Sequence, residues 1–172
     1  MRQGGLNIVE ILRAQHINRW TIVPTTRPQS LAEHTFNVTM LVRDYCRRVD
    51  WDDDVLMKAA LEHDLDEILT GDIPTPAKEA MRSQGFDPDK LNGKTKNVDM
   101  LDGPEKDALK CIDILESVHF LDNYGAGKRA NWVQGLLMNS LEMKVDRLGE
   151  WGDHFAEAML DLIREVMESV HG

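Results

Sequence analysis

The sequence predicts an all-α protein. Apolar residues recur at the three- and four-residue spacing of helices in nearly every long segment, and the β-branched alternation of strands is scarce. Glycine and proline separate these segments, and no internal repeat or low-complexity stretch is present. A chain of 172 residues suits one domain with its own core. We therefore expect a compact, all-α, single-domain bundle of about six helices.

The first predicted helix is short, covers residues 5–17, and precedes a loop that contains two prolines. Ser30 and Glu33 then form the pattern of a capping box, in which each side chain satisfies a free amide of the new helix. The second helix should run to about Val49. One of its faces is apolar and carries Leu31, Val38, Leu41, Val42, Tyr45 and Val49.

A third helix is predicted to follow the acidic run at 52–54, because negative charge favours a helix N-terminus. It should reach about His63, with a further helical turn through Ile68. Residues 70–76 contain a glycine and two prolines, so we expect the helix to break there.

The second half of the chain begins with a segment of low periodicity. Residues 84–103 are rich in Gly, Pro, Asn, Asp and Lys, which predicts a surface loop. Three helices are expected after it, at about 104–123, 129–148 and 153–170, with glycines between them.

The composition narrows the class of partner. The formal net charge is -10, from 30 acidic and 20 basic residues, which argues against nucleic acid as a partner. The two cysteines, Cys46 and Cys111, lie in apolar helical patterns and do not suggest a disulfide framework. With neither a membrane-spanning stretch nor an apolar signal-peptide core in the sequence, we expect a cytoplasmic protein that does not bind a membrane.

Four polar residues interrupt the apolar helix faces and are candidate metal ligands. His34 shares the inward face of its helix, and His63 points inward with Asp64 directly after it. Asp113 interrupts an apolar run in the middle of a helix. Taken alone, His34 is better explained by a core histidine bonded to a backbone carbonyl. For Asp113 a solvent-facing position is the alternative, but the apolar residues beside it favour an inward one. Together the four residues fit the mixed nitrogen and oxygen ligands of a catalytic metal.

Such a ligand set suits Zn, Co, Mn, Fe or Ni with overlapping preference. It also leaves room for a water molecule, whose pKa the metal lowers towards neutrality.

The pattern His34, His63-Asp64 and Asp113 resembles the H…HD…D pattern of the HD-domain phosphohydrolases. The chain is more closely similar to the bacterial HD-type 5′-deoxynucleotidases and to short phage dATP triphosphohydrolases. The stretches that carry this similarity are 17–20, 32–34 and, above all, 63–78 (HDLDEILTGDIPTPAK). The resemblance covers about residues 6–125 and implies that 1–172 form a single HD-type domain.

The resemblance also implies roles for the polar residues around the metal. Arg19 would bind the substrate phosphate, and Lys78 would supply a second cation. A second metal ion such as Mg would accompany the phosphates of the substrate. Glu67 would act as the general base or orient the attacking water, and Asp72 would be the companion acid. Each residue has a simpler explanation: Arg19 as a surface ion pair, Glu67 as a solvated helix residue, and Asp72 as a turn former.

Three apolar residues would contact the nucleoside. Trp20 would pack on the sugar or base and disfavour a 2′-hydroxyl, and Pro76 would contact the base from the other side. Ile22 could line a purine pocket and exclude a 2-amino group, which would favour adenine. Trp20 as a core residue and Ile22 as loop packing are the competing explanations.

The predicted reaction is metal-dependent hydrolysis at the phosphorus nearest the sugar of a 2′-deoxynucleotide. Two substrates remain open: a triphosphate such as dATP, which we favour, and a monophosphate, as in the 5′-deoxynucleotidases. Alarmone hydrolases share the His-Asp followed by Glu but not the continuation at 70–76, and a non-catalytic nucleotide-binding module is the fourth alternative. The resemblance also implies a homo-oligomer that acts in the bacterial cytosol, including the case of a phage enzyme in its host.

Overall fold

Helices are the only regular secondary structure in the computed structural model, which describes residues 7–88 and 96–168. Two isolated β-bridges tie loop segments together. The all-α prediction is confirmed. In the described ranges no helix is long and apolar enough to cross a membrane.

The N-terminal segment forms two short pieces rather than the continuous helix predicted at 5–17. Helix α1 spans Ile8–Ile11, and a 3-10 helix spans Leu12–His16. Asn7 caps α1 by accepting hydrogen bonds from two backbone amides. Residues 5 and 6 of the predicted helix lie outside the described residues.

Helix α2 spans Leu31–Val49, as predicted, and Ser30 caps it through a 3.1 Å hydrogen bond from the Glu33 amide. The capping box is only half formed. The Glu33 carboxylate pairs with Arg27 at 2.6 Å and 3.0 Å instead of returning to the Ser30 amide. A bidentate guanidinium pair is stronger than a hydrogen bond from a neutral amide, so the Glu33 carboxylate binds Arg27.

The middle of the chain contains more helix than predicted. Helix α3 spans Asp54–Glu62 and α4 spans Glu67–Thr70, which agrees with the expected break at Gly71. Helix α5, Thr75–Ser83, and helix α6, Lys96–Met100, were not predicted. The estimate of about six helices is therefore too low.

The missed helix α5 has a physical reason. Pro76 lies in the first turn of this helix, where a missing amide hydrogen costs nothing, so the prolines of 70–76 end one helix and begin another. Helix α6 falls inside the segment 84–103 that was predicted to be a loop, of which 89–95 lie outside the described residues.

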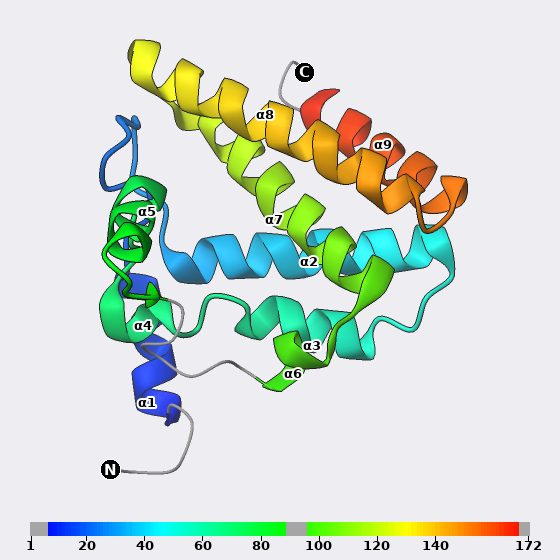
Figure 1. Cartoon of the computed structure of the whole chain (residues 1–172), viewed down its shortest axis with the longest axis horizontal. Coiled ribbons are helices and arrows are strands. Elements are labelled where there is room, and N and C mark those ends of the chain that lie inside the picture. The colour runs from blue at the N-terminus through cyan, green and yellow to red at the C-terminus, as the bar shows by residue number, and fades with distance from the viewer. Residues whose placement is uncertain (1–6, 89–95, 169–172) are drawn as a thin grey trace.

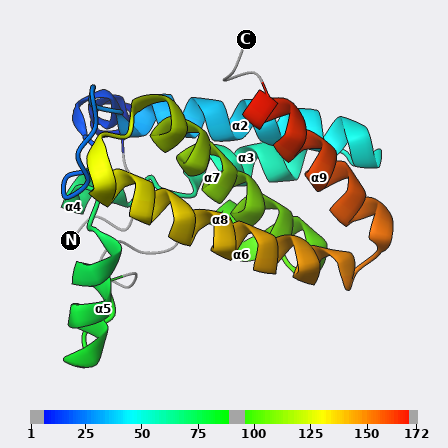
Figure 2. The same cartoon turned by 90° about the horizontal axis from the view of Figure 1, so that it is seen from above.

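The C-terminal half consists of three helices near the predicted bounds: α7 at Gly103–Tyr124, α8 at Gly127–Gly149 and α9 at Asp153–Glu168. The predicted end of the last helix, at 170, lies outside the described residues. Helix α7 packs against α2, α8 and α9, and α3 packs against α2 (Figure 1). Figure 2 shows α5 projecting away from this body.

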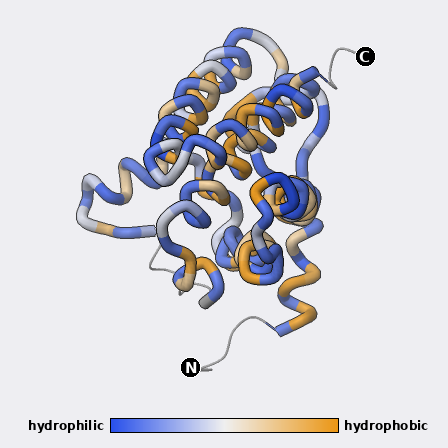
Figure 3. Tube along the Cα trace, turned by 90° about the vertical axis from the view of Figure 1, so that its right-hand side faces the viewer, coloured by the Kyte–Doolittle hydropathy of each residue, from blue (hydrophilic) through white to orange (hydrophobic). Residues whose placement is uncertain are grey.

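Hydrophobic and hydrophilic residues alternate along the helices (Figure 3), and the apolar faces meet in one main core. Tyr45 and Leu115 are fully buried there, and both cysteines lie buried as free thiols. The core therefore fixes α2, α3 and α7 relative to one another. These are the helices that present, or lead into, the four candidate ligands.

A loop at 17–30 folds back over one end of α7. Backbone hydrogen bonds join Thr26 to Tyr124 at 2.8 Å and Ala126 to Pro24 at 2.9 Å. Within this loop Trp20 has a φ of 63°, in the left-handed region that a bulky residue rarely adopts. A strained backbone of this kind persists only where surrounding contacts hold it, and such positions cluster at functional sites. Trp20 is therefore a candidate functional residue.

Candidate metal centre and its cavity

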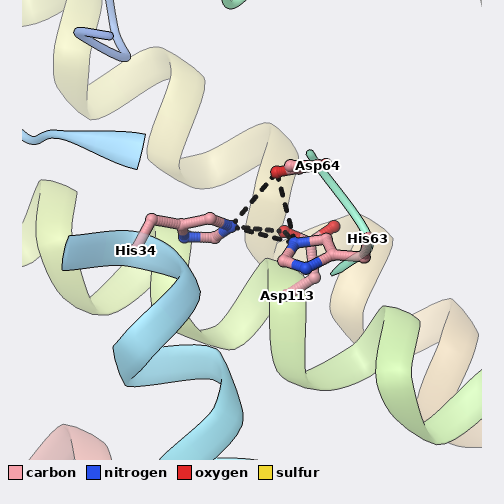
Figure 4. Close-up of side chains that lie close together, drawn as sticks. All are labelled: His34, His63, Asp64 and Asp113. Carbon is pink, nitrogen blue, oxygen red and sulfur yellow. Dashed lines mark hydrogen bonds and ion pairs between the residues drawn. The ribbon is translucent and has the colours of Figure 1, made fainter. Parts of the chain in front are cut away.

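The four predicted metal ligands lie together (Figure 4). His34 comes from the first turns of α2, His63 and Asp64 directly follow α3, and Asp113 lies midway along α7. One donor atom from each residue lies within 4.8 Å of all the others. Residues separated by up to 79 positions in the chain are thus brought to one point by helix packing.

The spacing of the donor atoms fits a single ion. His34 Nε2 is 3.3 Å from His63 Nε2, 3.5 Å from Asp64 Oδ2 and 3.3 Å from Asp113 Oδ1. His63 Nε2 is 3.2 Å from Asp64 Oδ2 and 3.9 Å from Asp113 Oδ1. Donors that bind one transition metal at about 2.0–2.2 Å are about 3.0–3.5 Å apart when adjacent and up to about 4.4 Å apart when opposite. The residues present therefore fit a divalent transition metal.

The charges of the cluster also call for a cation. Burial and the charge of Arg19 lower the pKa of His34, but hydrogen bonds to Asp113, Asp64 and Glu116 outweigh them and raise it to about 10. Without a metal, the carboxylates of Asp64 and Asp113 thus hold a proton on His34 Nε2. A divalent ion would take the place of that proton.

His63 is oriented for the same purpose. Its Nδ1 lies 2.7 Å from the carbonyl oxygen of Ala60, which can only accept, so Nδ1 carries the hydrogen and Nε2 faces the cluster with its lone pair. Asp113 is held by Lys110, whose Nζ lies 2.6 Å from Oδ2. Burial raises the pKa of Asp113, but Lys110 and His34 outweigh burial and hold it far below its usual range.

A cavity of about 460 Å³ opens in front of the cluster. Asp64 and Asp113 belong to its lining, whereas His34 and His63 do not. All of the other residues predicted to bind substrate or catalyse the reaction line this cavity. They are Arg19, Trp20, Ile22, Glu67, Asp72, Pro76 and Lys78.

Glu67 has the environment of a base rather than of a solvated helix residue. Its side chain is buried, with Oε1 3.3 Å from Lys78 Nζ and Oε2 without a hydrogen-bond partner among the described residues. Burial and the charges of Asp64 and Asp72 raise the pKa of Glu67 to about 8. A carboxyl group with a pKa near neutrality can both take and return a proton.

Arg19 is likewise not a surface ion pair. Its side chain is 12% exposed, its Nη2 donates to Ser117 Oγ at 3.4 Å, and its Nη1 is 3.6 Å from a carboxylate oxygen of Glu116. Within the described ranges, Nη1 has no hydrogen-bond partner. A buried, unpartnered guanidinium donor beside a cavity is suited to an anion such as phosphate.

Trp20 forms a half-buried wall of the cavity. Its backbone amide donates to Asp72 Oδ2 at 3.3 Å, and its ring is parallel to that of Phe120 at 6.2 Å. Asp72 therefore holds the strained backbone of Trp20, a contact that the sequence did not suggest. Ile22 is half exposed on the same loop.

Several lining or supporting residues were not predicted. Lys110, Ser117 and Arg129 line the cavity, and the buried side chains of Glu116 and Gln29 lie behind it. Lys110 and Glu116 stand three residues before and after Asp113, so helical spacing from that ligand was the available signal for them. Gln29, in a loop, carried no periodic signal.

Comparison with known proteins agrees with this site. Residues 9–107 match the family model described as HD domain. A dATP triphosphohydrolase of Cyanophage S-2L is 37% identical over 143 residues, which are 79% of this chain and 81% of the relative. One from Salmonella phage PMBT28 is 36% identical over 134 residues, 71% of this chain and 69% of the relative.

Two further likenesses concern activity and structure. A 5′-deoxynucleotidase of Citrobacter koseri is 34% identical, but over 74 residues, 38% of this chain and 36% of the relative. The solved structure of the Cyanophage S-2L HD phosphohydrolase DatZ, bound to dA and one catalytic Zn²⁺ ion, superposes with a TM-score of 0.76 at 29% identity. The match covers 95% of this chain and 98% of that one.

Proposed function

The chain belongs to the HD domain family, and from that membership we propose that it hydrolyses dATP to deoxyadenosine and triphosphate with a divalent metal, best matched by Zn²⁺. One observation carries the proposal: the four-donor cluster lies at a cavity whose lining also includes the basic side chains of Arg19 and Lys78 and the aromatic ring of Trp20. A phosphate beside a nucleoside is the ligand for which such a lining is complementary.

His34, His63, Asp64 and Asp113 would hold the metal. When bound, it would polarise the phosphoryl group and lower the pKa of a water molecule. The reaction adds the oxygen of water to the phosphorus nearest the sugar and breaks the bond from that phosphorus to the 5′-oxygen. Triphosphate and deoxyadenosine are then the two products.

The side chains around the metal would supply the remaining interactions. Arg19 would bind the phosphate next to the sugar, and Glu67 Oε2 would accept the proton of the attacking water. Lys78, which lies against Glu67, would contribute a second positive charge. Asp72 would keep Trp20 in place and could return a proton to the leaving oxygen.

The apolar residues on the cavity wall would contact the nucleoside and determine which one binds. The Trp20 ring would contact the sugar or base and leave no room for a 2′-hydroxyl. Ile22 and Pro76 would contact the purine, with Ile22 placed against a 2-amino group. These contacts rest on the position of the three residues on the cavity lining.

A 5′-deoxynucleotidase acting on monophosphates is the second candidate, because curated relatives with that activity match 38% of the chain. Two observations favour the triphosphate. The triphosphohydrolase relatives match 71% to 79% of the chain, and the cavity carries Arg129 in addition to Arg19 and Lys78. Three phosphates need more positive charge than one.

Product chromatography after incubation with dATP, dAMP and ATP tests the proposal, with Zn²⁺, Co²⁺, Mn²⁺ or Mg²⁺ added in turn. We expect triphosphate and deoxyadenosine from dATP and little turnover of ATP. Phosphate released from dAMP would favour the second candidate, and no turnover of any nucleotide would exclude both. Homo-oligomeric assembly, absence of nucleic-acid binding and a cytosolic location stay predictions, which light scattering, DNA-binding assays and cell fractionation can check.

A further inference from the structure

A buried carboxylate that was not predicted from the sequence lies behind the metal cluster. Glu116, on α7, is 1% exposed. Its Oε2 is 2.5 Å from His34 Nδ1, and its Oε1 accepts from Gln29 Nε2 at 2.7 Å and from Asn37 Nδ2 at 3.0 Å. Arg19 Nη1 lies 3.6 Å from Oε2. So many donors around one carboxyl group stabilise its ionised form.

Gln29 continues this arrangement to the substrate wall. It is fully buried, and its Oε1 accepts the indole hydrogen of Trp20 at 2.8 Å. The indole can only donate and the ionised Glu116 can only accept, so the Gln29 amide has one possible orientation. Three hydrogen bonds thus link the His34 ring to the Trp20 ring through two buried side chains.

The orientation of the hydrogens has a consequence for the metal. Because ionised Glu116 accepts, His34 Nδ1 must carry a ring hydrogen. Once a metal displaces the proton that Asp64 and Asp113 hold on Nε2, that nitrogen offers its lone pair to the ion. An isosteric amide in place of this carboxylate would present a donor or a weaker acceptor to Nδ1. The tautomer with the hydrogen on Nε2 would then be favoured, and that nitrogen could not bind a metal.

We propose that Glu116 is a positioning residue that fixes the metal-binding tautomer of His34, and that Gln29 extends its hydrogen bonds to hold Trp20 against the nucleoside. The inference rests on the proposed function, since it takes His34 as a ligand and Trp20 as a substrate contact. Both residues act through others and touch neither the metal nor the substrate. Together they fix the position of the His34 ring relative to the Trp20 ring.

Zinc affinity of the metal-stripped protein, measured by competition with a chromophoric chelator, tests the first arm. We expect Glu116→Gln to weaken zinc binding about 10- to 100-fold. Glu142→Gln, the same change at an exposed position of α8, should leave it unaltered. Equal zinc affinity in Glu116→Gln and the unaltered protein would overturn this arm.

Binding of deoxyadenosine to the zinc-loaded protein, measured by calorimetry, tests the second arm. Gln29→Leu removes the acceptor of the Trp20 indole while Glu116 keeps His34 and Asn37. We expect deoxyadenosine binding to weaken about tenfold, because a buried donor is left unpaired, with zinc affinity changed less than in Glu116→Gln. Unchanged deoxyadenosine affinity would overturn this arm.

A measurement on the unaltered protein covers the case in which a variant does not fold. Nitrogen-15 NMR of the zinc-loaded protein should show the hydrogen of His34 on Nδ1 and none on Nε2. A hydrogen on Nε2 would contradict the proposal. If the unaltered protein does not bind zinc at all, the proposed function fails rather than the role of Glu116.

Discussion

The floor and the wall of the cavity are built differently. The floor is formed by the four predicted metal ligands, one of them fully buried, which lie on long helices or directly at a helix end. Of these, Asp64 and Asp113 reach the cavity lining. The wall consists of Trp20, Ile22 and Pro76, which lie on a loop and on the first turn of a short helix and are partly exposed. The floor is therefore suited to fixed chemistry, whereas the wall can change its specificity without disturbing the core.

Loss of a floor residue should have the largest effect. We expect Asp64→Ala to abolish both zinc retention and dATP hydrolysis, because it removes a ligand and leaves the remaining donors too few. Metal content by elemental analysis and product chromatography measure the two effects. Asp66→Ala, two positions away and outside the four-donor cluster, should keep the metal. Normal activity of Asp64→Ala in a metal-free preparation would refute the assignment.

Glu67 lines the same cavity but is not one of the four candidate ligands, so its replacement should separate metal binding from catalysis. Glu67→Gln should lower kcat about 10²- to 10⁴-fold, the usual range for a lost general base, while zinc content stays at one per chain. Metal loss in this variant would instead indicate that Glu67 is itself a metal ligand.

The next effect concerns the phosphate. Arg19→Lys keeps the charge but loses the planar fork, so kcat/KM for dATP should fall about 10- to 100-fold. Arg13→Lys, at an exposed position on the preceding 3-10 helix, is the matched control. If the two variants had equal kcat/KM values, Arg19 would be a structural partner of Glu116 and Ser117 only.

The smallest effect should come from the wall. Ile22→Ala should lower the preference for dATP over 2-amino-dATP roughly tenfold, the value of removing a few methylene groups from a pocket, and leave zinc affinity unaltered. Competition between the two nucleotides, followed by chromatography, measures this ratio. An unchanged ratio would show that Ile22 only packs the loop.

The sequence predicted the four candidate ligands of the floor but not the residues that hold them in place, such as Glu116. His34, His63 and Asp113 each broke an apolar helical period, which is a signal that a linear sequence carries. Glu116 broke the same period on the same helix, yet no partner for it was visible, because Gln29 and Asn37 lie 87 and 79 positions away. Only the packing of the folded chain brings Glu116 next to these two partners.

The errors of secondary structure have a similar origin. Helix α5 begins at prolines that elsewhere end helices, and Glu33 was expected to cap its own helix before Arg27 was known to lie beside it. The hydrogen bond from the strained Trp20 backbone to the Asp72 carboxylate could not be predicted either, since the two residues lie 52 positions apart. That residues 1–172 form a single domain stays a prediction.

Hydrolysis of dATP in water enriched in oxygen-18 is the most direct test of the central claim, which is attack at the phosphorus next to the sugar. Mass spectrometry of the products should show one labelled oxygen in triphosphate and none in deoxyadenosine. Label in deoxyadenosine, or products that are dADP and phosphate, would contradict it.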